Sequence, residues 1–146
     1  MAKSGYPPEI ERLVAALCDT FVVRERRDRL AVKPDEFLDR LCHHPGIFDR
    51  RQMIAIPRGP VRVEPPQALR MAGCTGVATY LGAWEGLEVG SYPIDTACAM
   101  VDRSGGALAS SADGRVAYYK SEDGDRFLLV SDPVALGRVA AAIDQR

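Results

Sequence analysis

Residues 107–130 read ALASSADGRVAYYKSEDGDRFLLV, in which two Asp-Gly pairs separate three apolar segments. Asp-Gly favours a tight hairpin turn, because both residues tolerate the positive φ angles that a two-residue type I′ turn requires. The pairs are Asp113-Gly114 and Asp123-Gly124, and an earlier break lies at Gly105-Gly106. The stretch from residue 94 to residue 130 is therefore predicted as an antiparallel β-meander.

The first Asp-Gly pair also predicts a register. A hairpin closed at residues 113–114 places Leu108 opposite Tyr119 and Ala109 opposite Tyr118. The next connection, 121–125, is longer and acidic, and it leads into the sequence FLLV. Four consecutive apolar residues in that last strand indicate that both faces of the sheet are covered.

Helices are expected before and after the meander. Ser131-Asp132-Pro133 is typical of a helix start, and apolar residues recur after it at helical spacing. An amphipathic helix is predicted over residues 9–29, and a shorter one runs from Pro34 to the stop signal Pro45-Gly46. Residues 52–56 and 61–64 are predicted as short strands.

Together these elements predict an α+β fold with N-terminal helices, an antiparallel β-meander sheet and a C-terminal closing helix. A chain of 146 residues that is 47% apolar can form a single core without metals or disulfides. We expect one domain over residues 1–146, in which residues 1–8 form a flexible N-terminus.

The composition favours a cytoplasmic bacterial protein. No stretch reaches the ~18 apolar residues that cross a bilayer, and the first residues do not resemble a secretion signal. Arginine outnumbers lysine 16 to 3 and asparagine is absent, which is typical of a GC-rich bacterial genome. The four cysteines are never spaced as CxxC, so we expect buried, unpaired thiols.

Carboxylates make the best candidate site. Residues 1–70 carry 13 basic and 10 acidic side chains, whereas residues 71–146 carry 6 and 10. Acidic surfaces steer association with basic protein partners. We therefore predict a protein-binding surface, for a toxin or an effector, made of Glu122, Asp123, Asp125, Asp113, Glu85 and Glu88.

A small enzyme or ligand-binding domain is the first alternative. Cys74, between Gly73 and Gly76, could act with an imidazole from His43 or His44. Cys42-His43-His44 also supplies zinc-type ligands, but the run lacks the spacing of known zinc motifs. We therefore predict no catalytic residue, no metal and no cofactor.

Nucleic-acid binding is the second alternative. Arg50, Arg51, Arg58 and Arg62 could form a basic surface for phosphates. No aromatic residues interleave with these arginines, and no helix-turn-helix or RNA-binding motif frames them. The sequence therefore favours a protein partner over DNA or RNA.

Two segments resemble the SUKH superfamily of bacterial immunity proteins. One runs from Pro34-Asp35-Glu36-Phe37-Leu38 to Pro45-Gly46, and the other from Asp113-Gly114-Arg115-Val116-Ala117-Tyr118-Tyr119 through Asp123-Gly124 to Leu128-Leu129-Val130-Ser131. The chain departs from the family at Pro45, where an asparagine is usual, and after Ser131, where a Ser-Phe pair is absent. The resemblance implies an immunity-type protein that neutralises a toxin.

Overall fold

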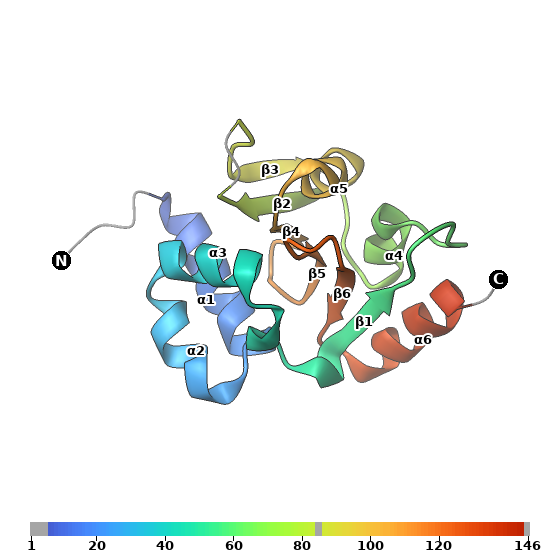
Figure 1. Cartoon of the computed structure of the whole chain (residues 1–146), viewed down its shortest axis with the longest axis horizontal. Coiled ribbons are helices and arrows are strands. Elements are labelled where there is room, and N and C mark those ends of the chain that lie inside the picture. Colours follow the sequence, from blue (N-terminus) through green and yellow to red (C-terminus); the bar gives the residue numbers. More distant parts are fainter. Residues whose placement is uncertain (1–5, 84–85, 145–146) are drawn as a thin grey trace.

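A single antiparallel sheet forms the centre of the molecule, with its strands in the order β1-β6-β5-β4-β2-β3 (Figure 1). A computed structural model describes residues 6–83 and 86–144. The strands are β1 (Met53–Ile56), β2 (Val77–Gly82), β3 (Gly90–Pro93), β4 (Ala107–Ser110), β5 (Val116–Lys120) and β6 (Arg126–Val130). The helices are α1 (Pro8–Phe21), α2 (Arg24–Ala31), α3 (Pro34–His43), α4 (Pro65–Met71), α5 (Ile94–Arg103) and α6 (Pro133–Asp144). The predicted α+β class, with helices at both ends of the chain, is confirmed.

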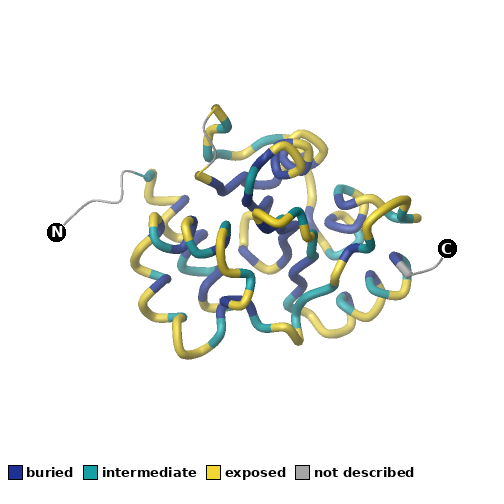
Figure 2. Tube along the Cα trace, viewed as in Figure 1, coloured by how far each residue is buried: buried dark blue, intermediate teal, exposed yellow. Residues whose placement is uncertain are grey.

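Helices cover both faces of the sheet, as the apolar run in β6 predicts. In Figure 1, α1, α2 and α3 gather on one side of the strands and α4 and α6 on the other. Two apolar clusters fill the space between sheet and helices: the α4–α6 cluster, with buried residues of α4, α5 and α6, and the α1–α3 cluster, with buried residues of α1, α2 and α3. Side chains of β5 alternate between them: Val116 and Tyr118 face the α4–α6 cluster, whereas Ala117 and Tyr119 face the α1–α3 cluster. Figure 2 shows the central strands buried and the connecting turns exposed.

The strand pairings also define two ends of the sheet. Ile56, Arg126, Lys120, Ala107 and Gly82 pair in one continuous row across five strands. We call this row the Lys120 end. The β5–β6 turn, the lead-in to β4 and the β2–β3 loop all leave the sheet there, and the β4–β5 turn lies at the opposite end.

The predicted hairpin register is confirmed, since Leu108 pairs with Tyr119 and Ala109 with Tyr118. The predicted type I′ turn is wrong, because Gly114 has φ +71° but no described non-glycine residue has a positive φ. The turn is wider, and the N–H of Gly114 donates to the Ser111 carbonyl at 3.1 Å. The Ser111 hydroxyl also accepts hydrogen bonds from the amides of Arg115 and Val116, both at 3.2 Å, which favours the wider turn.

Residues 94–103 are a helix, not the start of the meander. In α5, Ile94, Ala97, Cys98 and Val101 are buried at spacings of three and four residues and pack on the sheet. That spacing belongs to a helix, because a strand would bury every second residue. Residues 61–64 likewise form no strand, whereas the strand predicted over 52–56 is confirmed as β1.

The helix predicted over residues 9–29 is divided into α1 and α2. The break lies at Val22 and Val23, where Val22 forms a β-bridge with Phe48. The Val23 N–H donates to the Ile47 carbonyl at 2.7 Å, and the Asp49 N–H donates to the Phe21 carbonyl at 2.7 Å. The backbone groups freed at the break are therefore bonded to a segment more than twenty residues away.

The expected flexible N-terminus, residues 1–8, is described only in part. Residues 1–5 lie outside the described part of the chain. Pro8 is already the first residue of α1, where its fixed φ and missing N–H suit the first helical turn.

Candidate functional site

The acidic β5–β6 turn lies against the end of helix α3. The backbone N–H of Glu122 donates to the Cys42 carbonyl at 3.2 Å. The Glu122 Oε2 atom also lies 2.7 Å from His43 Nδ1. Two features that are far apart in the sequence, the Cys42-His43-His44 run and the acidic turn, therefore form one site.

Cys42 is held from its other side by the two glycines before β4. Its Sγ donates a hydrogen bond to the Gly105 carbonyl at 3.2 Å. Gly106 approaches so closely that a Cβ built on it would lie 2.6 Å from the sulfur and 2.8 Å from Cys42 Cα. Burial raises the pKa of the Cys42 thiol, and the charges of Glu122 and Asp39 raise it further.

His43 lies between two carboxylates. Its Nδ1 faces Glu122, and its Nε2 lies 3.7 Å from Asp39 Oδ1, one turn earlier on α3. The side chains of His43 and Glu122 are 47% and 44% exposed. The contact at Nδ1 therefore orients the imidazole, which still reaches solvent, and Asp39 lies nearby on its Nε2 side.

Backbone hydrogen bonds close the turn itself. The Ser121 N–H donates to the Asp125 carbonyl at 2.9 Å, and the Gly124 N–H donates to the Ser121 carbonyl at 3.0 Å. Asp125 forms an ion pair with Arg58, whose Nη2 lies 2.8 Å from its Oδ1. Asp123 is exposed, and its carboxylate makes no hydrogen bond or ion pair with any described residue.

The other predicted acidic residues are divided between the two ends of the sheet. Glu88 lies in the β2–β3 loop, at the Lys120 end, and its carbonyl accepts a hydrogen bond from the Tyr92 hydroxyl at 2.8 Å. Asp113 lies in the β4–β5 turn, at the opposite end. Glu85 lies outside the described residues. Of the two that the structure describes, Glu88 lies at the same end as residues 122–125 and Asp113 does not.

Asp113 stabilises its own turn. Its Oδ1 accepts hydrogen bonds from the Ser111 hydroxyl at 2.7 Å and from the Arg115 N–H at 3.1 Å. The bond from Ser111 is the main reason that the pKa of this carboxyl is lowered. Asp113 also borders a shallow depression of about 190 Å³, together with Gly73 and Asp132. Its carboxylate is thus engaged within the hairpin.

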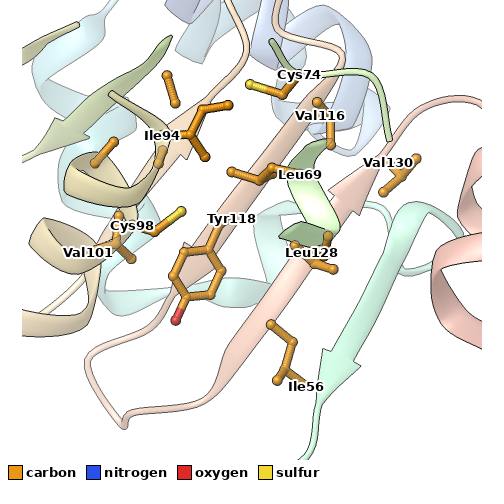
Figure 3. Packing of buried hydrophobic residues seen from close by; sticks show 14 of the residues in the cluster. Ile56, Leu69, Cys74, Ile94, Cys98, Val101, Val116, Tyr118, Leu128 and Val130 are labelled. Carbon is orange, nitrogen blue, oxygen red and sulfur yellow. The ribbon is translucent and has the colours of Figure 1, made fainter. Parts of the chain in front are cut away.

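The residues of the enzyme alternative are not brought together. Cys74 is 2% exposed and packs near Val116 and Leu69 in the α4–α6 cluster (Figure 3). Helix α3, at whose end His43 and His44 lie, packs on the other face of the sheet. Burial also raises the pKa of the Cys74 thiol, which opposes formation of a nucleophilic thiolate. The expectation of buried thiols holds for Cys18, Cys74 and Cys98, whereas Cys42 is partly exposed.

The four arginines of the nucleic-acid alternative are exposed, but two of them are engaged in ion pairs. Arg51 is bound to Asp49 at 2.9 Å, and Arg58 is bound to Asp125. Arg50 and Arg62 make no side-chain bond with any described residue. Half of the predicted basic surface is therefore neutralised by neighbouring carboxylates.

Two residues of the site have a place that the sequence interpretation does not foresee: Asp39 is not singled out there, and Arg58 is named only as a candidate for nucleic-acid binding. Asp39 precedes His43 by four residues, and this spacing on a helix already places the two side chains on one face. Arg58 contacts the acidic turn across 67 residues of sequence. The spacing was a usable signal for Asp39, whereas the sequence contains no comparable signal for Arg58.

Comparison of the chain with protein-family models, with curated proteins and with solved structures finds no match. Within the described part of the chain, every helix is too short or too polar to traverse a bilayer. The function must therefore be argued from the site.

Proposed function

We propose that this protein is a small cytoplasmic binding module that recognises a basic protein partner through the β5–β6 turn and the adjoining Lys120 end of the sheet. In this proposal the protein acts as a bacterial immunity protein, which neutralises a toxin, or as an escort for an effector. The SUKH-like segments support the immunity type, because one of them runs through this turn. The surface is defined by Glu122, Asp123, Asp125 and Glu88.

The carboxylate of Asp123 carries the proposal. It is exposed and unpaired among the described residues, on a turn that backbone hydrogen bonds hold in place. Binding to a carboxylate on an ordered turn costs less conformational entropy than binding to one on a loop that becomes ordered only in the complex. Its position favours recognition of a lysine or arginine on the partner.

The surface is less anionic than the sequence suggests. The three carboxylates of residues 122–125 and the Arg58 guanidinium leave a formal charge of −2. A basic partner must therefore compete with Arg58 for Asp125 and with His43 for Glu122. We expect the association rate, more than the final affinity, to fall as salt is added.

A capture experiment in the native host tests the proposal. Tagged wild-type protein should retain one stoichiometric basic partner, and Asp123→Lys should lower its affinity at least tenfold. Asp19→Lys is the matched control, because Asp19 is an exposed carboxylate on α1 that makes no side-chain bond with any described residue. Equal capture by the wild type and Asp123→Lys, or no stoichiometric partner at all, would contradict the proposal.

A further inference from the structure

Three side chains at the end of α3 and in the β5–β6 turn form a compact group of metal-ligand types. Cys42, His43 and Glu122 each offer one ligand atom, and these atoms lie within 4.8 Å of one another. No other set of three or more Cys, His, Asp or Glu side chains in the described ranges meets this condition. We propose that Cys42, His43 and Glu122 bind a zinc ion.

Contacts outside the three ligand groups hold them near one another. The Glu122 N–H is bonded to the Cys42 carbonyl, and the Tyr119 hydroxyl donates to the carbonyl of Leu41. Gly106 leaves the space that Cys42 occupies. These contacts do not use the thiol, the imidazole or the Glu122 carboxylate. The site is thus assembled by the fold before a metal arrives.

The histidine is oriented as a metal ligand requires. Ligating imidazoles almost always donate their second N–H to a carboxylate, a carbonyl or water, which fixes the tautomer. When zinc takes Nδ1, the proton of the Nδ1–Glu122 hydrogen bond leaves that nitrogen and the neutral imidazole carries its proton on Nε2. Asp39 Oδ1 lies 3.7 Å from Nε2, and a rotation of either exposed side chain would bring it close enough to accept a hydrogen bond. Asp39 is therefore a positioning residue for His43.

Small side-chain movements would admit the ion. His43 Nδ1 and Glu122 Oε2 are 2.7 Å apart, whereas two ligands of a tetrahedral zinc with bonds of about 2.0–2.1 Å stand roughly 3.3 Å apart. Both side chains are about half exposed, so they can separate by that difference without disturbing the core.

The ligand set selects zinc over the common hard cations. Calcium and magnesium prefer oxygen ligands, whereas zinc is bound by thiolate, imidazole and carboxylate together. Three protein ligands leave the fourth tetrahedral position to water or to a side chain of another molecule. On binding, the Cys42 thiol gives up its bond to the Gly105 carbonyl and releases its proton to solvent as the S–Zn bond forms.

This inference does not depend on the proposed protein partner. Zinc would engage Glu122 but leave Asp123 free, so the two proposals can fail separately. Failure of zinc binding leaves capture of a partner by Asp123 untouched, and the reverse also holds.

Cobalt and zinc titrations of the metal-free protein test the site. After treatment with a chelator, one zinc ion per chain should bind, with release of one thiol proton at neutral pH. Cobalt should produce the near-ultraviolet charge-transfer band of a thiolate–cobalt bond, and zinc should abolish it. Absence of stoichiometric binding, or cobalt binding without that band, would overturn the proposal.

Adjacent histidines provide a matched pair of variants. His43→Gln should weaken zinc binding at least tenfold, whereas His44→Gln should leave it unchanged, because His44 is outside the ligand group. Cys42→Ser should remove the cobalt band, and Asp39→Asn should weaken binding about 10- to 100-fold.

Circular dichroism establishes that each variant is folded. If Cys42→Ser does not fold, Glu122→Gln and His43→Gln carry the test, because both replace half-exposed side chains. Equal losses in the two histidine variants, or unchanged affinity in His43→Gln, would show adventitious surface binding and overturn the site.

Discussion

The amide nitrogen of Glu122 lies 3.2 Å from the carbonyl oxygen of Cys42, so the backbone itself joins the acidic turn to the end of helix α3. The side chains of Glu122 and His43 form a second contact between the same two segments. Contacts made by the backbone should therefore matter more for stability than this exposed side-chain hydrogen bond.

Replacement of Gly106 should disrupt the junction. An alanine Cβ would meet both the sulfur and the Cα of Cys42 at a residue with φ +143°. Backbone strain and overpacking together predict a loss of roughly 2–4 kcal/mol in the free energy of unfolding for Gly106→Ala. Urea denaturation measures this loss.

Gly46→Ala is the control for this loss. Gly46 has no positive φ, and a Cβ there would meet nothing within 4 Å. Its unfolding free energy should stay within about 1 kcal/mol of the wild type. Similar losses in both variants would mean that close contact with Cys42 is not the cause.

The hydrogen bond between His43 and Glu122 should contribute little to stability. Both side chains are about half exposed, and exposed pairs contribute about 0–1 kcal/mol. His43→Gln should therefore lower the free energy of unfolding by less than about 1 kcal/mol at pH 7. A loss above 2 kcal/mol in urea denaturation would show that the pair, and not the backbone contact, holds the turn.

Thiol reactivity should separate Cys42 from the other three cysteines. Burial raises the pKa of Cys18 and Cys98 to about 12, and Cys74 is 2% exposed. With Ellman's reagent, the native protein should therefore release one equivalent well before the other three, although more slowly than the unfolded protein releases its four, because the pKa of the Cys42 thiol is itself raised. Cys42→Ser should abolish that equivalent. A fast equivalent that persists in Cys42→Ser and vanishes in Cys74→Ser would restore the enzyme alternative.

The sequence predicts the core of this fold better than its junctions. The Asp113-Gly114 turn signal is local, so the register of the β4–β5 hairpin, which pairs Leu108 with Tyr119, could be read from the sequence. The helical spacing of α5 was also present in the sequence, but the interpretation of residues 94–130 as a continuous meander obscured it. In contrast, the break at Val22 depends on pairing with Phe48, a distant residue.

The site is less predictable for the same reason. Cys42-His43 and the acidic turn are each visible in the sequence, and each alone is typical of a solvated helix end or hairpin tip. Their contact follows from α3 packing beside β5, where the Tyr119 hydroxyl reaches the Leu41 carbonyl. Only the folded arrangement changes Glu122 from a surface charge into a neighbour of Cys42.

Two buried tyrosines should make the fold sensitive to alkali. Burial raises the pKa of Tyr118 and Tyr119, and for Tyr118 the hydrogen bond to Asp102 at 2.5 Å raises it further. Their protonated forms thus stabilise the folded state fully below the unfolded tyrosine pKa of about 10, and this stabilisation is lost as the pH rises above that value.

Denaturation at several pH values tests this sensitivity. Between pH 9 and pH 11, the free energy of unfolding should fall more steeply in the wild type than in a variant carrying Tyr118→Phe and Tyr119→Phe. The buried thiols contribute equally to both proteins, so the difference isolates the tyrosines. If spectrophotometric titration shows all five tyrosines ionising near pH 10 in a protein that remains folded, the burial of these two hydroxyls is wrong.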